Sequence, residues 1–107
     1  MNNAEILDSL AQVIAARKGG DTSRSYVAKL FAKGTKKIAQ KVGEEGVETA
    51  LAAVAGDRDE VISESADLLF HLMVLWSQMD VAPEEVLQEL ARREGVSGID
   101  EKNSRKD

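Results

Sequence analysis

The sequence predicts an all-α fold: a bundle of four to five helices, dimeric, around a central antiparallel helix hairpin. Apolar residues recur at helical spacing through most of the chain, and no segment alternates apolar and polar residues as a half-buried strand does. Turn residues and capping motifs divide this pattern into helix-length segments. With 107 residues, 43% hydrophobic and 31% charged, the chain suits one folded domain, and helical proteins this small often add a partner subunit.

The first two predicted helices flank a turn-rich loop. The sequence NNAE at residues 2–5 resembles a capping box, and the apolar residues that follow at helical spacing place a helix over residues 3–17. The segment GGDTS, residues 19–23, is expected to be a loop. SYVAKLFAK then predicts a short helix over residues 25–33, after which Gly34 and Thr35 break or bend the chain.

Two long helices form the predicted hairpin. The first covers about residues 36–55 and is closed by Gly56, and DRDE at residues 57–60 caps the second, over about residues 58–79. The second half of this helix, ADLLFHLMVLW, is apolar on nearly every side, which indicates deep burial or subunit packing. Pro83 starts a last helix that ends near Arg93. We therefore expect a domain over residues 1–94 and a polar, frayed tail over residues 95–107.

Composition excludes several kinds of site and partner. The chain has no cysteine, which removes disulfides and thiolate metal ligands and agrees with a reducing compartment. The N-terminal segment lacks the order of a secretory signal, and no apolar run reaches membrane-spanning length, so we expect a cytoplasmic protein with no membrane partner. Residues 44–67 hold eight acidic groups and one basic group. This acidic block would repel nucleic acid, so no nucleic-acid partner is expected.

Five carboxylates of the predicted hairpin are placed to converge. They belong to Glu44, Glu45, Glu48, Glu64 and Asp67. Spacings of three and four residues put like charges on one face of each helix, and antiparallel pairing through the short connection at Gly56 brings both groups to the same height. Crowded carboxylates need neutralising, and Mg²⁺ takes oxygen ligands of this kind with water and substrate phosphate. Gly43 and Gly46 beside them would let a substrate or a neighbouring helix come close.

Other interpretations of these residues stay open. A solvated helix face carries glutamates at this spacing without any site, although Asp67, at the start of the apolar run, would need a partner if buried. A di-iron centre would need histidines three residues after glutamates, and the single histidine, His71, follows Leu68 at that spacing. Since His71 lies four residues after Asp67, we expect it to hydrogen-bond that aspartate or to be satisfied in the core.

Two lysines extend the glutamate stripe toward the N-terminal end of the same helix. Lys37, Lys41 and Glu45 follow one another at intervals of four residues, so they share one face. The N-terminal end of a helix also attracts anions, so the two lysines predict a site for substrate phosphates. The alternative is a solvated basic face whose lysines pair with Glu44 or Glu45.

The segments that carry these residues resemble a known family of enzymes. KVGEEGVETALAA followed by ESADLLFHLMVLW is similar to the EExxE and ExxD signature of the all-α nucleoside triphosphate pyrophosphohydrolases, the MazG-like superfamily. Within it, SYVAKLFAKGTKKIAQKVGEEGVETALAA resembles the phosphoribosyl-ATP pyrophosphatases of histidine biosynthesis. The lysine-rich part of this segment is what points to that family.

The resemblance implies Mg²⁺-dependent hydrolysis of phosphoribosyl-ATP to phosphoribosyl-AMP and pyrophosphate by a homodimer, the second step of histidine biosynthesis. Glu45, Glu48, Glu64 and Asp67 match the metal-binding carboxylates of the superfamily, and Glu44 is the additional acidic residue. Glu44 or Glu45 is the candidate for the catalytic group that takes the proton of the attacking water. Two other functions stay open: a housekeeping pyrophosphohydrolase for free (d)NTPs and a helical dimerisation module without catalysis.

Overall fold

Five helices and no strand make up residues 1–95, the part of the chain that this computed structural model describes. The helices are α1 (Asn3–Arg17), α2 (Tyr26–Lys33), α3 (Thr35–Val54), α4 (Arg58–Gln78) and α5 (Pro83–Arg93). The predicted all-α class is confirmed, and the helices begin and end within one residue of their expected positions. The predicted tail covers mainly residues 96–107, which lie outside the described residues.

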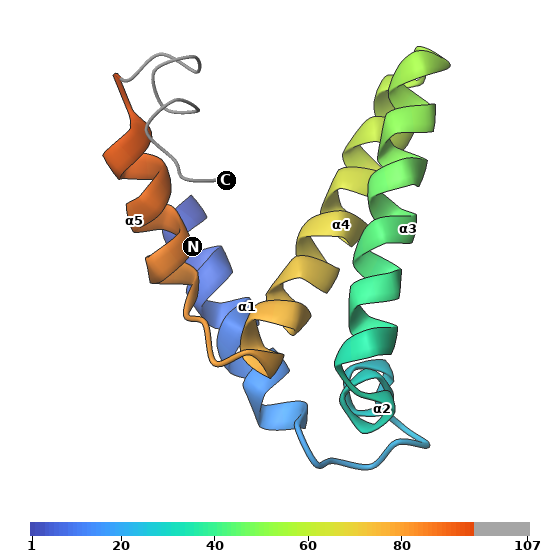
Figure 1. Cartoon of the computed structure of the whole chain (residues 1–107), viewed down its shortest axis with the longest axis vertical. Coiled ribbons are helices and arrows are strands. Elements are labelled where there is room, and N and C mark those ends of the chain that lie inside the picture. The colour runs from blue at the N-terminus through green and yellow to red at the C-terminus, as the bar shows by residue number, and fades with distance from the viewer. Residues whose placement is uncertain (96–107) are drawn as a thin grey trace.

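The helices form two arms that meet at one end of the molecule (Figure 1). In one arm α3 and α4 pack antiparallel along their length, and in the other α1 lies against α5. The short helix α2 lies across the foot of α3, where it also contacts α1 and α4. No helix in residues 1–95 combines the length and apolar character needed to span a membrane.

Side-chain caps set the start of α1 and α4 as the sequence predicts. Asn2 accepts a hydrogen bond from the backbone N–H of Glu5 at 2.9 Å, and its amide donates to the Glu5 carboxylate at 2.8 Å. Asp57 accepts from the backbone N–H of Glu60 at 3.1 Å, so α4 begins directly after it. These bonds satisfy N–H groups that have no partner inside the helix.

Two glycines in the left-handed region delimit α3. Gly34 has φ +91° and lies between α2 and α3, and Gly56 has φ +74° in the connection to α4. A side chain would be strained at such φ values, so glycine lets the chain reverse within a few residues. The short connection at Gly56 is the reason that α3 and α4 form a hairpin.

The core cluster of residues 1–95 lies where the two arms meet. It contains Ile14 of α1, Leu30 of α2, Ile38 of α3, and Met73 and Val74 of α4. Each side chain is at most 3% exposed. Four helices therefore share one small core at the foot of the hairpin.

The apolar second half of α4 is buried on one side only. His71, Met73 and Val74 are buried, whereas Leu69 is 41% exposed. The sequence predicts deep burial or subunit packing for this segment. One face is deeply buried, and subunit packing stays a prediction for the face that carries Leu69. A single chain leaves that second face in water.

The register of the hairpin is visible at its foot. The amide of Gln78 in α4 donates to the hydroxyl of Thr35 in α3 at 3.0 Å, and Ile38 and Val74 meet in the core one turn further along. Because α3 and α4 rise equally per residue in opposite directions, residues at equal steps from these pairs stand at the same height. This register decides which side chains can meet higher in the hairpin.

Truncation of Ile38 should destabilise the protein far more than truncation of an exposed isoleucine. Ile38→Ala empties a site that is 0% exposed, so it should lower the free energy of unfolding by about 2–5 kcal/mol. Ile6→Ala removes the same atoms from a residue that is 48% exposed, and should cost less than about 1 kcal/mol. Urea unfolding followed by circular dichroism measures both. Equal losses would contradict the location of the core.

Candidate functional site

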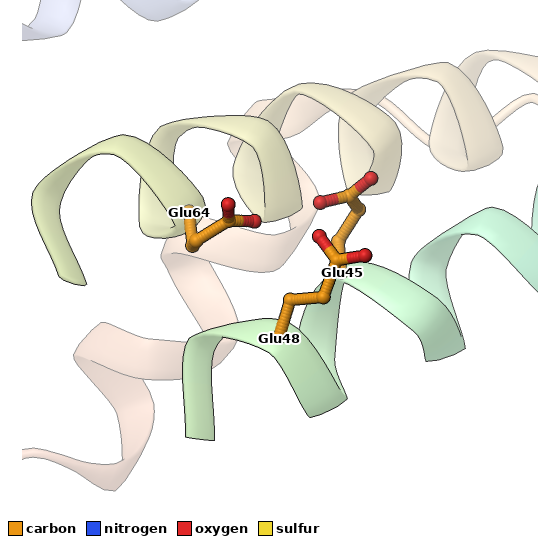
Figure 2. Close-up of side chains that lie close together, drawn as sticks. All are labelled: Glu45, Glu48 and Glu64. Carbon is orange, nitrogen blue, oxygen red and sulfur yellow. The ribbon is translucent and has the colours of Figure 1, made fainter. Parts of the chain in front are cut away.

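Three glutamates converge across the middle of the hairpin. Glu45 and Glu48 extend from α3 and Glu64 from α4, with their carboxyl groups pointing toward one another (Figure 2). One oxygen of each carboxyl lies within 4.8 Å of the others. The spacing of three residues puts Glu45 and Glu48 on one face of α3, and the register places Glu64 opposite them. The convergence of these three predicted residues is therefore seen in the structure.

Two oxygens of this cluster are buried without a hydrogen-bond partner. They are Oε2 of Glu45 and Oε2 of Glu64. Glu45 as a whole is only 7% exposed, which is rare for a carboxylate. Buried polar atoms are normally paired because loss of water without compensation is costly. Two such oxygens in one carboxylate cluster fit a site that a proton or a cation would satisfy.

The carboxyl groups also perturb each other electrostatically. Glu48, whose carboxylate can accept a hydrogen bond from protonated Glu64, is the main cause that raises the pKa of Glu64 to about 7. Burial and then the nearby Glu45 carboxylate act in the same direction. Proximity of like charges disfavours ionisation, so around neutral pH Glu64 carries a proton part of the time.

Lys41 borders the cluster on its side nearer the core. Its Nζ is 3.6 Å from Oε2 of Glu44 and 3.8 Å from Oε1 of Glu45, and its side chain is 25% exposed. Burial tends to lower the pKa of Lys41, but Tyr26, Glu44 and Glu45 outweigh it and raise that pKa. Lys41 therefore stays charged. One ammonium group cannot balance all the carboxylates beside it.

Glu44 belongs to the lysine side of the site. Its Oε1 accepts a hydrogen bond from Gln40 at 2.7 Å, and this bond is the main cause that lowers the pKa of Glu44. The charges of Lys41 and Lys37 lower it further, against the opposite effect of burial. Glu44 is thus held ionised next to the lysines. Lys37 is half-buried and acts on Glu44 through its charge.

Asp67 differs from its expected environment. The sequence predicts that it begins a buried run, but it is exposed. It shares one face of α4 with the buried His71 and Val74, and it lies one to two turns further from the foot of the hairpin, beyond the core that α1 and α2 help to form. It is not among the three carboxylates that lie within 4.8 Å of one another in the described residues. Its backbone carbonyl accepts a hydrogen bond from Nδ1 of His71 at 2.7 Å. His71 is therefore satisfied in the core, as one of the two expectations stated.

The glycines beside the glutamates line open space. A Cβ added to Gly43 or Gly46 would meet no atom within 4 Å. Within residues 1–95 no helix comes close to them, so the approach of a substrate or of a neighbouring helix from a second subunit stays a prediction.

Sequence reasoning missed Tyr26 as a neighbour of the site. Its hydroxyl lies 2.9 Å from Nε2 of His71, and it adds to the charge environment of Lys41. The two hydrogen-bonded residues are 45 positions apart. No local pattern in the sequence signals that contact, because it depends on how α2 crosses the hairpin.

The raised pKa of Glu64 predicts that the cation-free protein loses stability as the pH rises. Its folded pKa, about 7, exceeds the ordinary value of 4.5, so the folded state binds this proton more tightly than the unfolded state. The stabilising contribution is complete below about pH 4.5 and is lost as the pH rises through about 7. Melting temperatures in EDTA between pH 5 and 8 should fall more steeply for wild type than for Glu64→Gln. Parallel curves would contradict the shift.

Comparison with known proteins identifies the family of the chain. A family model described as phosphoribosyl-ATP pyrophosphohydrolase matches residues 7–94. A protein of Novosphingobium aromaticivorans named phosphoribosyl-ATP pyrophosphatase is 66% identical over 98% of both chains. Relatives of the same name from Azospirillum brasilense and Rhizorhabdus wittichii are 59% and 62% identical, over 97% and 92% of this chain and 94% and 93% of their own. The chain belongs to the phosphoribosyl-ATP pyrophosphohydrolase family of enzymes.

Proposed function

We propose that this chain hydrolyses phosphoribosyl-ATP to phosphoribosyl-AMP and pyrophosphate in the cytoplasm, with Mg²⁺, as the second step of histidine biosynthesis. The observation that carries the proposal is the cluster of Glu45, Glu48 and Glu64, with two buried oxygens that lack partners. Relatives that cover nearly the whole chain bear the name phosphoribosyl-ATP pyrophosphatase.

The cluster has the chemistry that Mg²⁺ requires. This ion is bound by oxygens, usually of one or two carboxylates together with water and substrate phosphates. A cation held by Glu45, Glu48 and Glu64 would satisfy both orphaned oxygens and replace the proton on Glu64. Asp67 follows Glu64 by three residues on α4, so it is near enough along the helix to join as a fourth ligand.

Different residues of this chain would bind the phosphates, accept the proton of the attacking water and orient the lysines. Lys37 and Lys41 would bind the phosphate chain as point charges at the end of α3 where a helix favours anions. The lowered pKa of Glu44 makes it a weak base, so we assign the water's proton to Glu45 and the orientation of Lys41 to Glu44. When bound, Mg²⁺ would neutralise the phosphates and lower the pKa of the attacking water.

The proposal includes a homodimer. Several apolar side chains in the part of the hairpin beyond the core are 41–88% exposed, namely Val47, Leu51, Val54, Ile62 and Leu69. Within residues 1–95 no other element covers them. Exposed apolar surface shared by two adjacent helices favours packing against a second copy of the same hairpin.

Pyrophosphate release from phosphoribosyl-ATP, ATP and dCTP, with Mg²⁺ or with EDTA, tests the reaction. Wild type should release pyrophosphate rapidly from phosphoribosyl-ATP alone, and only with Mg²⁺. Glu48→Gln should lose more than about 100-fold in rate, because a ligand matters at least as much as the groups that orient it. Glu84→Gln, an exposed glutamate of α5, is the matched control and should keep the wild-type rate.

Each failure of this assay has a different meaning. Faster release from dCTP would favour a housekeeping pyrophosphohydrolase. No release from any nucleotide would favour a dimerisation module. Circular dichroism of Glu48→Gln separates loss of a ligand from loss of the fold.

Removal of the lysine charges should weaken substrate binding more than it affects stability. Lys37→Met and Lys41→Met should raise KM while the rise of the melting temperature with Mg²⁺ persists. Lys41→Met also loses its pairs with Glu44 and Glu45, worth about 0.2–0.5 kcal/mol each at a helix surface. Lys36→Met changes an exposed neighbour on another face and is the matched control. Unaltered kinetics in both variants would mean that these lysines form only a solvated face.

A further inference from the structure

Tyr26 presents an aromatic ring next to the carboxylate site. The residue is 50% exposed although its hydroxyl lies 2.9 Å from Nε2 of the buried His71. It is the first residue of α2, directly after the capping Ser25. The hydroxyl of Tyr26 is therefore hydrogen-bonded within the protein, while part of its ring is exposed to water.

The two hydrogen bonds of His71 show which atom donates in each of them. Nδ1 of His71 is 2.7 Å from the carbonyl oxygen of Asp67, which can only accept, so Nδ1 carries the proton. In the neutral ring Nε2 is then an acceptor, and the Tyr26 hydroxyl donates to it. Tyr26 is thereby tied to the turn of α4 that carries Asp67.

Ring contacts hold Tyr26 from the protein side. Its ring is stacked with Phe70 at 6.3 Å between centroids and 22° between planes. It meets His71 edge-on at 5.8 Å and 81°. The hydroxyl bond and these two contacts restrict the ring, so a ligand that used its free face would lose little conformational entropy on binding.

The hairpin register sets Tyr26 beside Lys41. Glu48 stands opposite Glu64, and seven residues from each along their helices are Lys41 and His71. Seven residues of helix span about 10 Å. Tyr26, bonded to His71, therefore stands at the level of Lys41, about 10 Å along the hairpin from the level of Glu48 and Glu64. The charge environment of Lys41 includes the Tyr26 phenol, in agreement with this placement.

We propose that the exposed face of Tyr26 stacks against the purine base of the nucleotide substrate. The inference rests on the proposed function, because it takes the phosphate chain to run from the carboxylates to Lys41. Cleavage between the α and β phosphates leaves the nucleoside on the α phosphate, so the base extends beyond the lysine, toward Tyr26. Aromatic rings bind bases by stacking without reading their edges. Tyr26 would thus select a nucleotide over a bare phosphate chain.

Calorimetric binding of ATP and of inorganic tripolyphosphate, with Ca²⁺ in place of Mg²⁺ to slow turnover, tests the stacking. The two ligands share a triphosphate and differ in the nucleoside. Wild type should bind ATP at least about fivefold more tightly, the lower limit for one stacked base. Tyr26→Leu should bring the two affinities within about twofold, whereas Tyr26→Phe, which keeps the ring and loses the bond to His71, should keep the preference for ATP.

Equal affinities of wild type for ATP and tripolyphosphate would overturn the inference, and so would a preference for ATP that persists in Tyr26→Leu. A loss of this preference in Tyr26→Phe as large as that in Tyr26→Leu would also overturn it. If circular dichroism shows that Tyr26→Leu does not fold, Tyr26→Trp is measured instead. Its larger ring should strengthen the preference for ATP, and an unchanged or weaker preference would count against stacking. A lack of pyrophosphate release from phosphoribosyl-ATP would remove the proposed reaction without altering this comparison, so the two failures are distinguishable.

Discussion

The close approach of Glu45, Glu48 and Glu64 across one hairpin is the constraint on which the rest of the structure depends. Like charges this close oppose folding, and two of their oxygens are buried without partners. The hairpin is nevertheless held in register from its foot, where Thr35 bonds to Gln78 and the buried core begins. Stabilising contacts and unfavourable charge thus occupy different heights of the same two helices, so the core can hold the carboxylates together.

The core at the foot of the hairpin also allows α3 to carry lysines near its start and glutamates in its middle, an arrangement that is unfavourable for the helix itself. A cation near a helix N-terminus opposes the helix dipole, and glutamates one turn apart repel each other. Lys41 offsets part of both costs through its pairs with Glu44 and Glu45. The result is a surface that changes from positive to negative along one stripe. A phosphate chain bound together with a cation has the complementary order of charges, so the proposed function would explain why the helix keeps this otherwise unfavourable order.

Capping and turn residues predicted the helices, and the pairing of two helices in a hairpin predicted that three carboxylates converge. Caps such as Asn2 and Asp57 and the turn at Gly56 act within a few residues, so the sequence reveals them directly. Glu45, Glu48 and Glu64 meet because helical spacing and one short connection suffice to bring them together. The exposure of Asp67 was missed because an apolar run does not reveal how far along the helix its buried face extends. The bond between Tyr26 and His71 was missed because the crossing of α2 is set by tertiary packing.

The raised pKa of Glu64 links the fold to the proposed chemistry. Without a cation, a proton on Glu64 is what relieves the repulsion from Glu48 and Glu45, and near pH 7 that proton is only partly present. The proposed divalent cation would have to displace this proton, so its binding would release a proton and become tighter as the pH rises through this range. Protonation and cation binding are therefore alternative ways to satisfy one cluster. The cluster is least stable where neither is available, at alkaline pH without cation, and relief of this repulsion would favour binding of the proposed cation.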